Sequence, residues 1–139
     1  MKQRIFIDTN IIMDLLSHRD PYYESAATLF NHIENGLLEG YASSLTFANL
    51  HYVLRKECGS HKTIEVLKNL RKVVVILPVD DSIIEQALNS GFKDFEDAIQ
   101  YHVATANNLT CIVTRNLKDF LAATIRVCTA KVFLTQFAP

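Results

Sequence analysis

One short stretch near the start of the chain, RIFIDTNIIMDLL (Arg4–Leu16), constrains the fold most strongly. Ile5–Ile7 form an apolar run that is typical of a strand buried on both faces. Asp8 follows at once, and the apolar residues after it recur at helical spacing: Ile11, Ile12, Leu15 and Leu16. Thr9 or Asn10 is the expected helix cap. The stretch therefore predicts a central strand, an acidic turn and a helix, which places Asp8 at the carboxyl edge of a sheet, where open α/β sheets bind ligands.

The rest of the chain alternates short strands with amphipathic helices. Apolar, β-branched runs predict four further strands: Tyr41–Ser43, Val73–Leu77, Thr110–Thr114 and Arg126–Cys128. Apolar positions at helical spacing predict six further helices over these segments: Ala26–Leu37, Phe47–Leu54, Ile64–Leu70, Ile83–Leu88, Ala98–Ala106 and Lys131–Phe137. The first of these is expected to end near Gly36 or Gly40. Ser44 or Thr46 is the expected cap of the second of these, Asp80 or Asp81 of the fourth and Asp94 of the fifth, while RNLKDF is expected to form a loop or short helix.

This alternation predicts an α/β fold in which a mostly parallel five-stranded sheet is covered by helices on both faces, a three-layer α/β/α arrangement. The 139 residues, of which 49% are hydrophobic, suffice for one domain over residues 1–139 with a real core. Lysine and arginine (14) nearly balance aspartate and glutamate (15), so the overall charge gives no nucleic-acid signature, although a local basic patch remains open.

Cysteine usage and hydropathy bound the environment of the protein. Cys58, Cys111 and Cys128 form no CxxC pair, which favours reduced thiols over a zinc site, and the last two lie in predicted strands, where a thiol behaves as a small apolar group. The N-terminal residues do not form a signal peptide, and no segment approaches the roughly 18–20 apolar residues of a membrane span. We therefore expect a soluble, cytoplasmic protein.

Acidic residues recur at positions equivalent to that of Asp8. Asp94 and Asp97 open a predicted helix and share one face of its first turn, and Asp119 follows the fourth strand. If both segments lie at the carboxyl edge of the sheet, the four carboxylates converge. Two carboxylates about 4 Å apart repel by roughly 4 kcal/mol at an effective dielectric of about 20, so such a cluster must take up protons or a hard cation such as Mg²⁺ or Mn²⁺.

Each of these acids also has a purely structural interpretation. Asp8 can serve only as a helix cap, Asp94 with Asp97 matches a capping box, and Asp119 can be a surface acid. Asp14 is expected on the solvent side of its helix. The five histidines form no pair at metal-binding spacing, and the chain has no GxSxG elbow and no glycine-rich phosphate loop.

Five short motifs occur in a particular order: IFIDTNIIMDLL, SSLTFANLHYVL, FEDAIQYHVA, IVTRNLKDF and RVCTAKVFL. In this order and spacing the chain resembles the PIN domains over nearly its whole length, and among them the small prokaryotic proteins that include VapC-type toxins. The resemblance implies a metal-dependent endoribonuclease that hydrolyses RNA phosphodiesters with bound Mg²⁺ or Mn²⁺. It makes Asp8 the first acid of the site, Asp97 the central one, and Asp119 or the Asn116 position the last, with Asp94 one turn from Asp97 as an additional ligand.

The same resemblance implies a substrate-binding set in this chain: Asn49, Thr114, Arg115 and Asn116. Asn49 stands where the family commonly has a glutamate, and Asn116 where many members have an aspartate. An amide offers a carbonyl oxygen but no charge, so the alternative function is a PIN-like module that binds RNA or a protein partner without turnover. A haloacid-dehalogenase-like phosphatase is disfavoured because its DxDxT signature requires an acid at Asn10.

The expected partners follow from this resemblance. An RNA backbone would have six cations available if they lie near the site: Arg19, Arg55, Lys56, Lys93, Arg115 and Lys118. A small antitoxin protein and a homodimer are implied by the family, and no membrane is.

Overall fold

The computed structural model describes residues 2–138 and contains one sheet with the strand order β3-β2-β1-β4-β5. All four strand pairings are parallel. The strands are β1 (Gln3–Ile7), β2 (Leu38–Ser43), β3 (Val75–Leu77), β4 (Cys111–Val113) and β5 (Arg126–Cys128). The predicted α/β class, the five strands and the central position of the first strand are therefore confirmed, with strand ends within about three residues of the expected ones.

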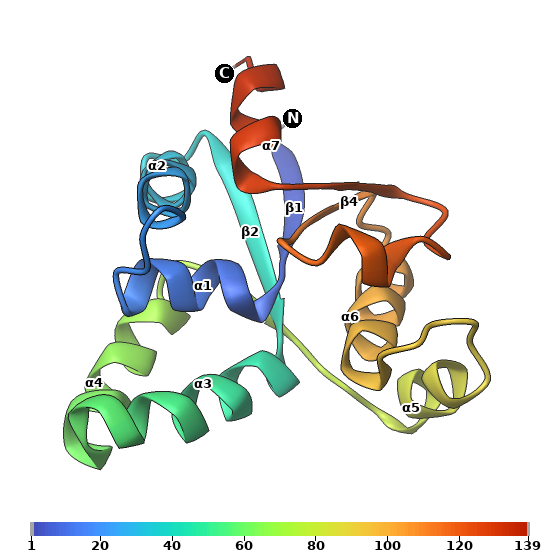
Figure 1. Ribbon diagram of the computed structural model, residues 1–139, viewed down its shortest axis with the longest axis horizontal. Coiled ribbons are helices and arrows are strands. Elements are labelled where there is room, and N and C mark those ends of the chain that lie inside the picture. The colour runs from blue at the N-terminus through green and yellow to red at the C-terminus, as the bar shows by residue number, and fades with distance from the viewer. Residues whose placement is uncertain (1, 139) are drawn as a thin grey trace.

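Helices cover both faces of the sheet (Figure 1). One face carries α1 (Thr9–Leu16), α2 (Tyr23–Glu34), α3 (Ser44–Cys58), α4 (Ser60–Arg71) and α7 (Ala130–Gln136). The other carries α5 (Asp81–Leu88), α6 (Phe95–Ala106) and the short 3₁₀ helix η1 (Leu117–Phe120).

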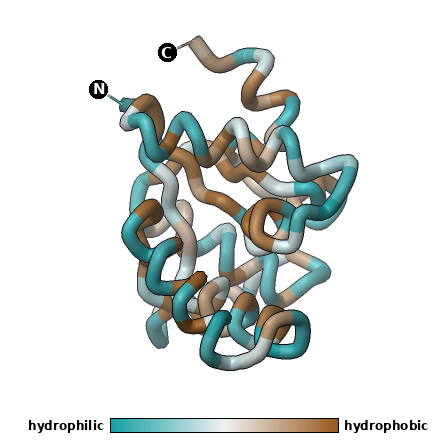
Figure 2. The backbone as a smooth tube through the Cα atoms, turned by 90° about the vertical axis from the view of Figure 1, so that its left-hand side faces the viewer, coloured by the Kyte–Doolittle hydropathy of each residue, from teal (hydrophilic) through white to brown (hydrophobic). Residues whose placement is uncertain are grey.

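The central strand β1 separates two hydrophobic cores. Ile5 and Ile7 belong to the core under α1, α2 and α3, whereas Phe6 belongs to the core under α5 and α6. All three side chains are fully buried, because successive residues of a strand point to opposite faces and both faces are covered. In Figure 2, hydrophobic colouring gathers in the interior, while the peripheral turns are largely hydrophilic.

Two helix caps lie one residue before the nearest expected position, and the first is Asp8, which the structural interpretation of this acid had offered as a cap. The Asp8 side chain itself caps α1 by accepting a hydrogen bond from the Thr9 backbone N–H at 2.9 Å, and Ser43 caps α3 by accepting one from the Thr46 N–H at 3.2 Å. In both cases the residue directly before the helix, which still has an extended backbone, is the cap: Asp8 follows β1, and Ser43 is the last residue of β2. Asp80 and Asp94 are confirmed as the caps of α5 and α6.

The helix predicted from Ala26 ends near Gly36, the first of the two glycines expected to stop it. α2 ends at Glu34, because Gly36 adopts a positive φ of 77° that terminates the helix, and Leu37 is 40% exposed outside it. β2 then begins at Leu38, three residues earlier than expected, and passes closely beneath α2: a Cβ atom at Gly40 would lie 2.7 Å from Ile33 Cδ1.

Cys111 and Cys128 are buried and free, as predicted. Within residues 2–138, no helix is both long enough and apolar enough to cross a bilayer.

Candidate functional site

A cavity of about 370 Å³, here called the acid pocket, opens at the carboxyl end of β1. It lies between the start of α1, the first turns of α3 and α6, and the loop after β4. Four of its lining residues are acids: Asp8, Asp94, Glu96 and Asp97. Polar side chains complete much of the lining: Thr9, Asn10, Asn49, Tyr52, Gln100 and Asn116. Three of the four predicted acids therefore lie around one cavity, although they come from positions almost 90 residues apart.

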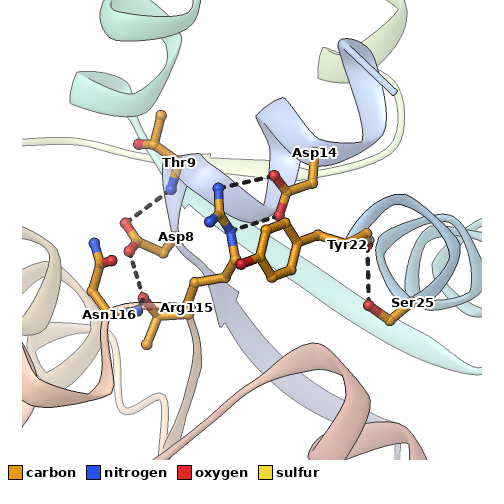
Figure 3. Close-up of polar contacts among 8 residues, drawn as sticks. Asp8, Thr9, Asp14, Tyr22, Ser25, Arg115 and Asn116 are labelled. Carbon is orange, nitrogen blue, oxygen red and sulfur yellow. Dashed lines mark hydrogen bonds and ion pairs between the residues drawn. The ribbon is translucent and has the colours of Figure 1, made fainter. Parts of the chain in front are cut away.

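Asp8 is buried and held by several hydrogen bonds at the floor of the acid pocket (Figure 3). Its Oδ2 accepts a hydrogen bond from Thr114 Oγ1 at 2.7 Å, and its Oδ1 accepts one from the Thr9 N–H. Burial raises the pKa of this carboxyl group, whereas these hydrogen bonds act in the opposite direction. Thr114, a predicted substrate residue, thus fixes the first acid in place.

Asp97 is the acid with the most strongly altered chemistry. It is 6% exposed, and its Oδ2 has no hydrogen-bond partner among the described residues. Burial first, and then the negative charges of Asp8, Asp94 and Asp119, raise the pKa of Asp97 from 3.8 to about 8. Without a cation, this carboxyl group is therefore largely protonated at neutral pH.

Gln100 connects the acid pocket to a buried polar network that sequence reasoning missed. Its amide nitrogen donates to Thr46 Oγ1 at 2.8 Å and to Asp8 Oδ1 at 3.5 Å, and its amide oxygen accepts a hydrogen bond from Ser43 Oγ at 2.6 Å. The available signal was its position: Gln100 follows Asp97 by three residues and so shares its helix face. A buried glutamine on that face requires polar partners.

The remaining predicted acid, Asp119, lies apart from the acid pocket. It belongs to η1 and lines a neighbouring cavity together with Lys93 and Lys118. Its charge contributes to the raised pKa of Asp97, but it does not line the same cavity. Asn49 and Asn116 both line the acid pocket, as the prediction requires for substrate-binding residues.

The pocket offers the oxygen donors that Mg²⁺ and Mn²⁺ prefer. The unpartnered Oδ2 of Asp97 and the mutual repulsion of the acids are features that a divalent cation would relieve. Within residues 2–138, no three acidic, histidine or cysteine side chains already stand in a metal-binding arrangement. Asp94 and Glu96 are exposed, and Asp94 Oδ1 accepts a hydrogen bond from the Asp97 N–H as the cap of α6.

The expectation that Asp14 faces solvent is wrong. Asp14 is 1% exposed and forms a two-pronged ion pair with Arg115, whose Nε lies 2.9 Å from Oδ2 and whose Nη2 lies 3.1 Å from Oδ1 (Figure 3). The guanidinium carbon of Arg115 also lies 4.0 Å from the centre of the Tyr22 ring. α1 is covered on this side by the loop after β4 and the start of α2, so an acid there needs a cation as its partner.

The PIN domain profile matches residues 4–118 of the chain. Among solved structures, a toxin–antitoxin complex from Klebsiella pneumoniae is 26% identical, with a TM-score of 0.68, and the match covers 91% of this chain and 97% of that one.

Two further structures give the same picture. Mycobacterium tuberculosis VapC20, described as a sarcin–ricin loop cleaving toxin, is 21% identical with a TM-score of 0.68 and coverage of 87% and 95%. VapBC-1 from nontypeable Haemophilus influenzae is 18% identical with a TM-score of 0.68 and coverage of 93% and 99%. A comparison with curated proteins found no match. Since the profile spans most of the chain, the protein belongs to the PIN domain family.

Proposed function

We propose that this protein is a metal-dependent endoribonuclease that hydrolyses RNA phosphodiesters with Mg²⁺ or Mn²⁺ held in the acid pocket by Asp8, Asp94 and Asp97, while Asp119, the fourth predicted ligand, adds its negative charge from the neighbouring cavity. The observation that carries the proposal is the environment of Asp97: a buried carboxyl group with one oxygen unpartnered among the described residues, whose pKa is raised to about 8 by burial and by four other carboxylates. Keeping several acids around one cavity destabilises a protein unless they serve a ligand. A hard cation is the ligand that these oxygens suit best.

In the proposed reaction, the cation and the residues of the acid pocket have different roles. A bound divalent cation supplies charge neutralisation for the phosphate and a more acidic water. Thr114 and Gln100 hold the Asp8 carboxyl group in one orientation, which fixes its two oxygens at the floor of the pocket. Asn49 and Asn116 present neutral amides along the wall, where they can hydrogen-bond a substrate without adding repulsion.

A second function is favoured by one specific observation. α3 contributes Asn49 to the wall of the acid pocket. Its side chain is a neutral amide, whereas a glutamate at this position would supply a charged oxygen ligand for a cation. The alternative is therefore a PIN module that binds RNA or a protein partner without turnover. It predicts RNA association in the presence of Mg²⁺ or Mn²⁺ and no cleavage product.

The structural neighbours extend the proposal to partners. The Klebsiella structure is a toxin–antitoxin complex, and VapBC2 from Rickettsia felis and VapBC from Salmonella typhimurium were both solved bound to DNA. We therefore propose that this chain is the toxin of a toxin–antitoxin pair, that a small antitoxin occupies or covers its site, and that it forms homodimers. Co-purification with the product of an adjacent small gene tests the partner, and light scattering tests the dimer.

Replacement of the acids tests the nuclease directly. Asp8→Asn and Asp97→Asn should each lower Mn²⁺-stimulated RNA cleavage by about 100-fold or more, because each removes a charged oxygen ligand. Circular dichroism should show a folded protein in both cases. Glu65→Gln, which changes an exposed acid on α4, is the matched control and should cleave like the wild type. Wild-type rates in both pocket variants would exclude this site.

A further inference from the structure

A second cavity of about 390 Å³ adjoins the acid pocket, and we call it the Arg115 pocket. It lies between α1, the start of α2 and the start of α7. Its polar and aromatic lining consists mainly of Asp14, Tyr22, Ser25, Arg115, Asn116 and Lys131. Asn116 lines both cavities, so the two are neighbours separated by one side chain. A volume of this size is in the range of small-ligand sites.

Arg115 is fixed at the wall of this pocket and still has hydrogen-bond donors to offer. Nε and Nη2 are taken by the Asp14 carboxylate, and the guanidinium plane packs on Tyr22 (Figure 3). Nη1 forms no hydrogen bond within residues 2–138, and the side chain is 26% exposed. A guanidinium that is anchored on one edge and free at another is pre-organised to bind an acceptor.

The acid pocket is acidic and suits a cation, whereas the Arg115 pocket is basic and suits the phosphates of a nucleic-acid strand. The acid pocket is lined by four acids and no lysine or arginine. The Arg115 pocket is lined by Arg115 and Lys131, and its single acid, Asp14, is already paired. Beside the cations stands Tyr22, a partly exposed aromatic ring (42%). Cations for phosphate and an aromatic ring for a base are the groups by which proteins bind single-stranded RNA.

We propose that the Arg115 pocket is a nucleotide subsite: it binds the nucleotide next to the scissile phosphodiester, with Arg115 and Lys131 on the phosphate and Tyr22 against the base. The inference rests on the proposed ribonuclease function, because it takes the acid pocket as the place where the strand is cut. Because the two cavities share Asn116, an RNA strand cut in the acid pocket would place its next nucleotide in the Arg115 pocket. An acidic segment of a protein partner is the competing occupant.

Binding of RNA without cleavage tests the subsite. The Asp97→Asn protein is titrated into a fluorescently labelled eight-nucleotide single-stranded RNA, and anisotropy gives the Kd at several salt concentrations. Adding Lys131→Ala should weaken binding about 3- to 10-fold and lower the salt dependence by about one counterion. Adding Tyr22→Leu should weaken binding about 5-fold or more, whereas Tyr22→Phe, which keeps the ring, should stay within about 2-fold.

Lys68→Ala on α4 is the matched control, because it removes the same charge at a residue that lines a different cavity and neither of these two pockets, and it should leave the Kd unchanged. Melting curves establish that each variant is folded, and Lys131, which is exposed, keeps the test valid even if Tyr22→Leu is unstable. Unchanged binding in both Lys131→Ala and Tyr22→Leu would overturn the subsite and leave the nuclease standing. No RNA binding by the Asp97→Asn protein, together with no cleavage by the wild type, would overturn both.

Discussion

At the scale of single residues, Asp97 couples the acid pocket to the stability of the fold. In the unfolded chain an aspartate loses its proton near pH 4, whereas in the folded protein the pKa of Asp97 is raised to about 8. The folded state therefore binds a proton that the unfolded state has lost throughout this interval. The resulting stabilisation is fully present below about pH 4 and disappears as the pH rises through 8.

We expect the free energy of unfolding in metal-free buffer to fall between pH 5.5 and 7.5, by up to about 1.4 kcal/mol per pH unit from this group. Asp97→Asn should make the fall clearly shallower, since an amide does not titrate. Urea unfolding at three pH values measures the slope, with Glu65→Gln as the control that keeps it. An equally steep fall in Asp97→Asn would contradict the assignment.

The Asp14–Arg115 ion pair gives a second prediction at this scale. Burial raises the pKa of Asp14, while the charge of Arg115 acts against that effect, so the carboxylate depends on its partner. Arg115→Leu should lower the free energy of unfolding by about 3 kcal/mol, because it leaves a buried acid unpaired. The double variant Asp14→Leu, Arg115→Leu should lose less than Arg115→Leu alone. A loss within about 0.5 kcal/mol for Arg115→Leu would show that the pair does not stabilise the fold.

At the scale of elements, the passage of β2 under α2 leaves no space for a side chain at Gly40. A Cβ there would lie 2.7 Å from Ile33 Cδ1 and 3.0 Å from Ile7 Cδ1, and both isoleucines are buried. Gly40→Ala should therefore cost about 2 kcal/mol through overpacking.

Ile33→Val removes the Cδ1 atom that makes the closest of these contacts. Alone it should cost about 1 kcal/mol, but combined with Gly40→Ala the total should be smaller than the sum by about 1 kcal/mol, because the clash is relieved. Chemical denaturation of the four proteins of this cycle measures the coupling. Strict additivity would mean that β2 adjusts in another way.

At the scale of the whole molecule, the candidate site exists only in the folded state. Asp8 and Asp97 come from different elements, so an unfolded chain cannot hold a cation between them. Binding to the folded state alone raises stability by mass action, about 1.4 kcal/mol at ten times the Kd.

We therefore expect millimolar Mg²⁺ or Mn²⁺ to raise the melting temperature by about 3–6 °C for a domain of this size. The shift should vanish in Asp8→Asn, whereas Glu65→Gln should retain it. No shift with either ion, or an undiminished shift in Asp8→Asn, would argue against a metal site in the acid pocket.

Several parts of this fold could be predicted because they depend only on residues that are adjacent in the sequence. The apolar run Ile5–Ile7 determines a strand buried on both faces, and Asp94 ahead of α6 determines its cap. The same local logic left two glycines, Gly36 and Gly40, as possible ends of α2, and the backbone uses Gly36, which adopts a positive φ.

The sequence by itself determined the alternation of strands and helices and the placement of acids at strand and helix ends, since these depend on neighbours along the chain. It also indicated the central position of β1, because a fully apolar strand has to be covered on both faces. Only the tertiary structure decided which polar groups meet: Gln100 with Asp8, Arg115 with Asp14, and Asp119 in a cavity of its own. The physical reason is that burial and charge pairing are set by segments distant in sequence. The same pattern of polar residues on a helix can face solvent in one protein and be buried in another. Asp14 is buried because the loop after β4 covers this side of α1.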